Sequence, residues 1–319
     1  MGVADYGRLT SITRGLVLPK IIDQIGDDHP LFDKLINKAK LETKGTQIEQ
    51  AVKYRHNSQG GSYAGLDPLD TAQEITRTKA IFPWKQMYQP IVINNIELAK
   101  NGGSNAEVAN LMETEMEEAK DSLTDKFCSK LFLDGTGNDG KDIDGLVAMV
   151  DDSTNVDVYG GITRSTYTWF KSNYTASVGA LTLADMATMH DSCSNGNDQP
   201  DLIVTTKTVR SFYEALLEAQ IRFEVGGKLD GGSLNVSFRG VEIIADEYCT
   251  AGYMYFLNMK KLKTKTLAHP DFPTDSRGFS VSEMQQPTNQ DGKVGFIFWY
   301  GNFYNQEPRK SGVLRGITS

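Results

Sequence analysis

The chain has 319 residues, 39% hydrophobic and 23% charged, which is typical of a folded protein that buries a sizeable core. Its formal net charge of -8 and isoelectric point near 5.1 argue against a nucleic-acid-binding protein that neutralises phosphates with excess lysine and arginine. There is no run of about 18 apolar residues and no apolar signal segment at the amino end, so we expect no membrane contact and a cytoplasmic chain.

Residues 1–45 are predicted to form an N-terminal arm and a short helix. Residues 1–27 carry short apolar bursts without a sustained period, which indicates an arm lying on another surface. Asp28-His29-Pro30 then begins a short amphipathic helix, because proline is tolerated in a first turn. The apolar residues of this helix are Leu31, Phe32, Leu35, Ile36 and Ala39.

Residues 46–82 are predicted to form an extended β-hairpin. Polar and apolar residues alternate with a period of two from Thr46, and again from Ile75 to Pro83, on either side of a glycine-rich polar segment. A two-stranded hairpin is not stable in water without further cover. We therefore predict that its partner is another copy of the chain, the alternative being a hairpin folded back on its own domain.

Residues 104–134 are predicted to form one long helix. Its apolar residues recur every three or four positions, and Ser104 with Glu107 fits a capping box. Asp134-Gly135 ends the pattern, and the length favours a spine that spans a domain. The apolar face consists of Val108, Met112, Met116, Ala119, Leu123, Phe127 and Leu131.

The second half of the chain is predicted to hold a compact mixed unit and a return of strands. Residues 150–180 indicate loop and weak strand, and residues 182–268 indicate two helices, the first with a capping box at Thr182, around a central sheet. After about Pro273 the pattern is strand again. Bulky residues on both faces around Trp299 predict a central strand covered on both sides.

We predict no catalytic residue, no cofactor-binding residue and no metal site. Gly135, Gly137 and Gly140 spell a phosphate-binding pattern, but a helix precedes them where such loops need a strand, so a flexible reversal is expected. His190 and Cys193 have no second pair for zinc. The three cysteines fit no metal spacing and are expected to be small buried residues.

The succession of parts resembles the major capsid protein of tailed bacteriophages, the Hong Kong 97-type fold of the α+β class. Residues 46–82 look like its extended loop, and residues 104–134 look like its spine helix, followed by a turn of the family's style (LFLDGTGNDGKDIDGL). The run PDLIVTTKTVRSFYEAL is similar to part of the axial domain, assigned to residues 151–268. The resemblance assigns residues 83–150 and 269–319 to the peripheral domain.

The resemblance implies a structural subunit of an icosahedral shell, a virion protein assembled in the host cytoplasm around double-stranded DNA that it contacts without sequence specificity. Its partners would be other copies in pentamers and hexamers, a separate scaffolding protein, a portal and a decoration protein. The rival interpretations are an encapsulin-like nanocompartment and an oligomeric enzyme with its site in residues 182–268. Cargo distinguishes the two kinds of shell.

Two sets of residues are predicted to contact neighbouring subunits. At the tip of the extended loop they are Gln59, Gly60, Gly61, Ser62 and Tyr63. In the arm they are Leu16, Val17, Leu18, Ile21, Ile22 and Ile25.

Overall fold

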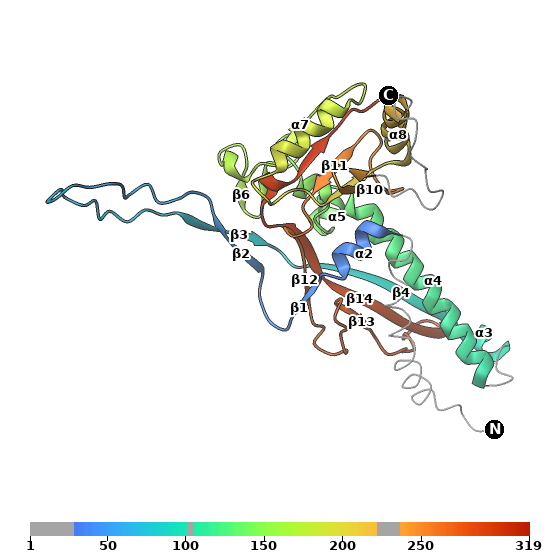
Figure 1. Ribbon diagram of the computed structural model, residues 1–319. Coiled ribbons are helices and arrows are strands. Elements are labelled where there is room, and N and C mark those ends of the chain that lie inside the picture. Colours follow the sequence, from blue (N-terminus) through green and yellow to red (C-terminus); the bar gives the residue numbers. More distant parts are fainter. Residues whose placement is uncertain (1–28, 101–104, 222–236) are drawn as a thin grey trace.

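A computed structural model describes residues 29–100, 105–221 and 237–319 of the chain. Two units lie end to end, and a long two-stranded ribbon projects from the region where they meet (Figure 1). One, here the long-helix unit, holds helix α4 (Asn105–Leu131) and a five-stranded sheet; the other, the two-helix unit, holds α7 (Leu183–Cys193), α8 (Lys207–Ile221) and a six-stranded sheet. The predicted arm, with Leu16, Val17, Leu18, Ile21, Ile22 and Ile25, lies outside the described residues.

The sheet of the long-helix unit is built around one central strand. Its order is β1-β12-β14-β13, and β4 also pairs with β14. Only the β1–β12 pair is parallel. The strands are β1 (Lys40–Glu42), β4 (Lys85–Asn94), β12 (Leu262–Leu267), β13 (Phe279–Val281) and β14 (Gly292–Asn305). The prediction that the C-terminal aromatic strand is central is therefore confirmed.

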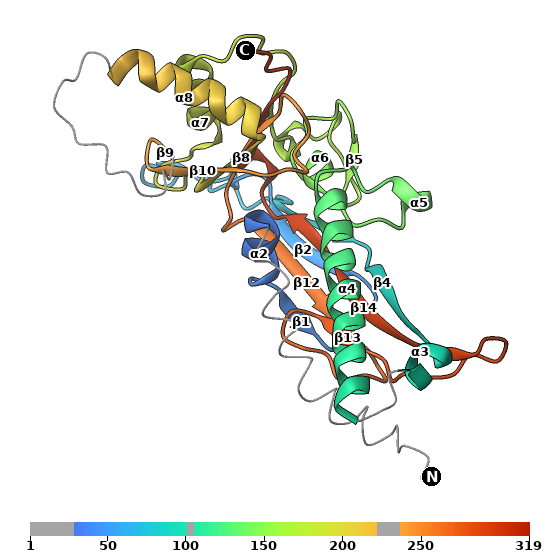
Figure 2. The ribbon, with the colours of Figure 1, turned by 90° about the vertical axis from the view of Figure 1, so that its right-hand side faces the viewer.

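Helix α4 covers one face of this sheet along its length (Figure 2). Ile297 and Trp299 of β14 are fully buried, and the Phe127 ring of α4 packs edge-on against Trp299 with centroids 4.9 Å apart. The other face of the strand is only partly covered by the described residues, among which no second helix lies over it. There Phe298 is only half-buried, beside His269 at 5.2 Å between ring centroids.

The long helix is confirmed, and at about 1.5 Å per residue it is about 40 Å long. Met112, Met116, Ala119, Leu123, Phe127 and Leu131 of the predicted face are buried. Ser104 lies outside the described residues, and nothing is described of the Val108 side chain. The helix ends at Leu131, before the predicted Asp134. Short helices α2 (Pro30–Ile36) and α3 (Asn95–Lys100) lie beside this unit. Four of the five predicted apolar residues are buried in α2, and Ala39 lies beyond its end and is half-buried.

The turn after α4 is more structured than predicted. It contains the short helices α5 (Gly137–Gly140) and α6 (Leu146–Met149). Helix α6 forms against the core, because its Leu146, Ala148 and Met149 are all buried. The glycine-rich pattern does not begin a regular helix whose N-terminus could bind phosphate. Asn138 and Asp139 inside α5 have left-handed backbone angles, so this short turn is not a right-handed helix.

The two-helix unit has a mixed sheet in the order β7-β15-β11-β8-β10-β9. Its strands are β7 (Asn173–Thr175), β8 (Leu202–Thr205), β9 (Ser237–Phe238), β10 (Val241–Ala245), β11 (Met254–Leu257) and β15 (Gly312–Leu314). The Thr182 hydroxyl accepts a hydrogen bond from the Asp185 amide at 3.1 Å, so the predicted N-cap of α7 is confirmed.

Sheet membership differs from the predicted ranges in two places. Strand β12 was placed in the 151–268 segment but pairs with β14 of the long-helix unit. Strand β15 was placed in the 269–319 segment but pairs with β11 of the two-helix unit. The chain thus crosses between the units more often than a division by sequence order allows.

Residues 150–180 combine short strands with a buried ionic cluster. The strands are β5 (Val158–Tyr159) and β6 (Ile162–Thr163), followed by a 3-10 turn, η1 (Thr168–Phe170). Asp151 is fully buried and accepts hydrogen bonds from the amides of Ser153, Asn155 and Val156. Burial alone would raise the pKa of Asp151, but these bonds and the nearby Arg164 hold it below its ordinary value.

Candidate intersubunit surfaces

The root of the ribbon is fixed to its own chain. Strands β2 (Ile48–Lys53) and β3 (Arg77–Phe82) pair antiparallel from Ile48↔Phe82 to Lys53↔Arg77. Ile48, Ala80 and Phe82 are each 1% exposed, and the Phe82 ring contacts Tyr159 with centroids 5.0 Å apart. The prediction of a hairpin without cover in its own chain is therefore wrong for the root, which the hydrophobic core stabilises.

The distal part of the ribbon has no such cover. Beyond Tyr54, whose amide bonds the Thr76 carbonyl at 3.1 Å, the two strands project away from both units (Figure 1). Large apolar side chains are open to solvent there, with Leu66 at 102% and Ile75 at 74% exposure. No described residue of the chain covers these side chains, so the distal ribbon is a surface available to a partner.

The ribbon reverses slightly later than predicted. The turn runs from Ala64 to Asp67, where the Asp67 amide bonds the Ala64 carbonyl at 3.2 Å. The register places residue 65 midway between the two strands, because partners such as Ile48 and Phe82 have numbers that sum to 130. The predicted tip residues Gln59, Gly60, Gly61, Ser62 and Tyr63 therefore lie on the strand that leads to the tip. All are exposed except Gln59, which is half-buried.

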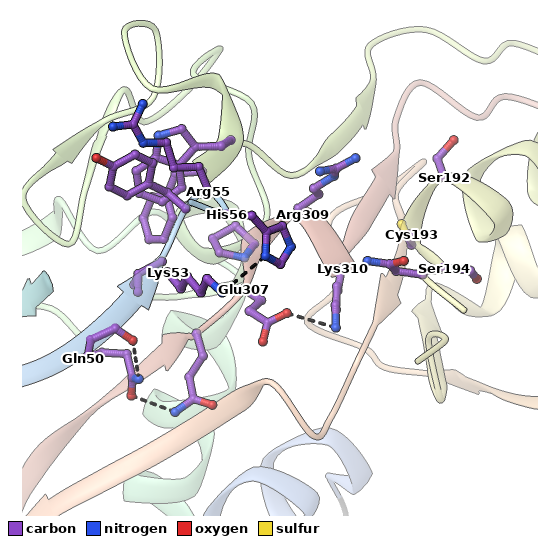
Figure 3. Close-up of a pocket in the computed structure, with 18 residues that line it drawn as sticks. Gln50, Lys53, Arg55, His56, Ser192, Cys193, Ser194, Glu307, Arg309 and Lys310 are labelled. Carbon is purple, nitrogen blue, oxygen red and sulfur yellow. Dashed lines mark hydrogen bonds and ion pairs between the residues drawn. The ribbon is translucent and has the colours of Figure 1, made fainter. Parts of the chain in front are cut away.

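A pocket of about 670 Å³ lies where the ribbon joins the body (Figure 3). Four segments form it: the outgoing strand of the ribbon, the turn η1, the C-terminal end of α7, and the turn η2 (Pro308–Lys310) after β14. We call it the root pocket. It is lined by residues 50–56, Trp169, Phe170, residues 192–195 and residues 306–310. The Tyr54 ring stacks on Trp169 with centroids 5.2 Å apart and forms an aromatic wall.

The root pocket carries positive charge on an otherwise acidic chain. Lys53, Arg55, Arg309 and Lys310 line it, with Glu307 as the one carboxylate among the lining residues. Lys53 donates to His56 Nδ1 at 3.3 Å, since an ammonium can only donate (Figure 3).

Among the described residues, Lys310 is the pocket cation that forms ion pairs with its own chain. Lys310 pairs with Glu307 at 3.0 Å and also with Asp198. Burial alone would raise the pKa of Glu307, but Lys261 and Lys310 hold it below its ordinary value. The hydrogen bond from Lys310, helped by Asn258, lowers the pKa of Asp198 to about 2.

The sheet face opposite α4 is a second partly open surface. Phe298 and Tyr300 are half-buried along β14, and His269 stacks with both at 5.2 Å between ring centroids. On neighbouring β4, Tyr88 is 62% and Val92 is 54% exposed. This aromatic face is another candidate for contact with a second protein.

The described residues hold no candidate metal cluster. Among them no group of three or more histidine, cysteine or acidic residues is placed to hold a metal ion. All three cysteines are buried, as predicted, and burial raises the pKa of Cys193 and Cys249 to about 12. His190 is 3% exposed in the core beside α7. Within the described ranges, no helix has the length and hydropathy to cross a membrane.

Sequence reasoning missed the root pocket. Its lining residues come from segments spread between residues 50 and 310, and no local motif links them. The only available signal was the contrast along the ribbon between basic Lys53 and Arg55 and the acidic segment that follows.

The comparisons with known proteins agree with this architecture. The family model described as the SU10 major capsid protein matches residues 70–318. No curated protein sequence matches the chain.

Solved structures with the same fold include phage capsids and one encapsulin. The capsid asymmetric unit of cyanophage A-1(L) aligns with a TM-score of 0.70 and 18% identity over 92% of this chain and 93% of that one. Mycobacterium phage Bobi aligns with a TM-score of 0.55 and 8% identity over 90% of both chains. An encapsulin complex from Synechococcus elongatus aligns with a TM-score of 0.52 and 12% identity, over 91% of this chain and 89% of that one. At these identities the likeness concerns the fold.

Proposed function

The chain belongs to the SU10 major capsid protein family, and on that premise we propose that its copies close a shell by overlapping through the distal ribbon. Its role is structural, since the family consists of capsid proteins and not of enzymes. Its place is the virion. The proposal concerns how the copies are joined.

One observation carries the proposal: the ribbon has a buried root and an exposed end. A buried root fixes the direction in which the ribbon leaves the body, because Phe82 and Ile48 are each 1% exposed. The exposed end presents Leu66, Leu69 and Ile75 at 102%, 63% and 74%. An exposed apolar ribbon is a ready partner for another surface. Rigid attachment with an uncovered end suits a contact between copies.

The finer arrangement follows the Hong Kong 97-type resemblance. The two-helix unit corresponds to the axial domain, meeting its copies around the centres of pentamers and hexamers, and the long-helix unit corresponds to the peripheral domain. The extended-loop residues Gln59 to Tyr63 and the arm residues Leu16 to Ile25 contact neighbouring subunits.

The partners follow the same resemblance. A separate scaffolding protein, a portal and a decoration protein complete the particle, which assembles in the host cytoplasm. The net charge of -8 favours a shell that encloses DNA without binding it tightly.

Deletion of residues 57–70 tests the proposal. The deletion spares the paired strands and the buried root, so the variant should remain folded and soluble but form no closed particles. Electron microscopy and light scattering would report particles, and circular dichroism with urea unfolding would report the fold. Intact shells from the deletion variant would refute the role of the ribbon. Wild-type shells that hold a protein cargo and exclude DNA would indicate a nanocompartment.

A further inference from the structure

We propose that the root pocket is the acceptor for the acidic tip of the ribbon of a second copy, so that ribbons join copies head to tail. This inference rests on the proposed function, because it names the partner of the distal ribbon. It assigns to the pocket a ligand class, an extended acidic peptide with apolar side chains, and identifies its source as this chain.

The pocket side of the contact is a set of cations. Lys53 and Arg309 make no ion pair with any residue that the structure describes, whereas Arg55 is near enough to Glu74 of its own ribbon to help lower the pKa of that carboxyl. Arg55 is turned toward its own ribbon, donating from Nε to the Ile75 carbonyl at 3.1 Å, with its guanidinium carbon 5.7 Å from the Tyr54 ring centroid. Arg309 is exposed, and Figure 3 shows it beside His56 with its guanidinium turned away from the Lys310–Glu307 pair. A carboxylate entering the pocket would find donors already in place.

The ribbon side of the contact has the opposite charge. Residues 57–76 contain Asp67, Asp70 and Glu74 but no lysine, arginine or histidine. Asp67 and Asp70 flank the turn on an exposed segment. Leu66 and Leu69 stand beside these carboxylates, and the Tyr54–Trp169 stack offers an aromatic wall for them. Charge and apolar groups therefore occur together on both sides.

A ribbon cannot reach its own root pocket. The two strands diverge from the body without turning back (Figure 1). At about 3.3 Å per residue, residues 54–65 place the tip about 40 Å from the root. A second copy displaced by about that distance would present its own root pocket to the tip. Such a contact is heterologous, and repetition about a rotation axis closes it into a ring.

Charge reversal and charge exchange test the inference in the full chain. The pocket variant Lys53→Glu/Arg309→Glu and the tip variant Asp67→Lys/Asp70→Lys should each raise the protein concentration needed for assembly about tenfold or more, through like-charge repulsion. Their combination restores opposite charges and should return that concentration to within about threefold of wild type. The control Lys44→Glu/Lys141→Glu makes the same change in net charge as the pocket variant, at exposed positions outside the pocket, and should assemble as wild type does.

Disulfide crosslinking tests the same contact by a measurement that does not depend on a loss of assembly. The pair Asp70→Cys/Arg309→Cys should form a ladder of covalent oligomers on oxidation, and neither single variant should, because the natural cysteines are buried. Assembly of both reversal variants at wild-type concentration, or failure of the combined variant to recover, would overturn the inference. Absence of shells from wild-type protein would instead refute the proposed function.

Discussion

Truncation of one buried and one exposed residue of the ribbon separates folding from assembly. Phe82 is 1% exposed between Tyr159 and Tyr304, at 5.0 and 5.1 Å between ring centroids, so Phe82→Ala should lower the free energy of unfolding by about 3–5 kcal/mol. Leu66 is fully exposed in the single chain, so Leu66→Ala should change that free energy by no more than about 0.5 kcal/mol.

The effect of Leu66→Ala on assembly should be large, in contrast to its small effect on the free energy of unfolding. If Leu66 is buried against a neighbour, removing about three carbons at about 0.8 kcal/mol each costs about 2 kcal/mol per contact, or about 30-fold in its association constant. Urea unfolding of unassembled subunits measures the first quantity, and light scattering across a concentration series measures the second. An unchanged assembly threshold for Leu66→Ala would refute burial of the ribbon tip.

Three further outcomes follow from single sites. Gly160→Ala should lower the unfolding temperature more than the control Gly161→Ala. Both positions have left-handed φ angles, so an alanine at either one destabilises the fold by about 1 kcal/mol. Only at Gly160 would the new methyl group also clash with a buried ring, that of Phe82, at 2.8 Å. Because the pKa of Asp198 is lowered from 3.8 to about 2, its stabilisation is present above about pH 4 and lost as the pH falls through 2. Chemical unfolding between pH 4 and pH 2 should show a smaller loss of unfolding free energy for Lys310→Met than for wild type. Equal losses would contradict the assignment of the lowered Asp198 pKa to Lys310. Asp151→Asn should lower the free energy of unfolding by about 3 kcal/mol or more, because it removes the buried carboxylate that pairs with buried Arg315 at 3.9 Å and lies near buried Arg164; a change under 1 kcal/mol in urea would contradict this.

Local patterns predicted the individual elements well. The 3.6-residue period of α4 and the Thr182 cap of α7 are properties of neighbouring residues, and both are confirmed. The end of α4 was placed three residues late, because the chain leaves the helix through a turn in which the Leu133 amide bonds the Lys130 carbonyl. Helix ends depend on such turns more than on periodicity.

What the sequence did not reveal depends on pairing between distant strands. The exchange of β12 and β15 between the units follows from their partners β14 and β11, which no local pattern specifies. The sequence predicts the tip of the ribbon at residues 59–63, whereas the register fixed by the buried root places it at Gly65. The root pocket was missed for the same reason.

The central claim is that the distal ribbon is covered by another copy of the chain in the assembled particle. Hydrogen–deuterium exchange of free subunits and purified shells, compared at residues 57–76, tests it most directly. We expect fast exchange in the free subunit and strong protection in the shell, with the strands of the root protected in both. Equal, fast exchange of residues 57–76 in both forms would contradict the claim.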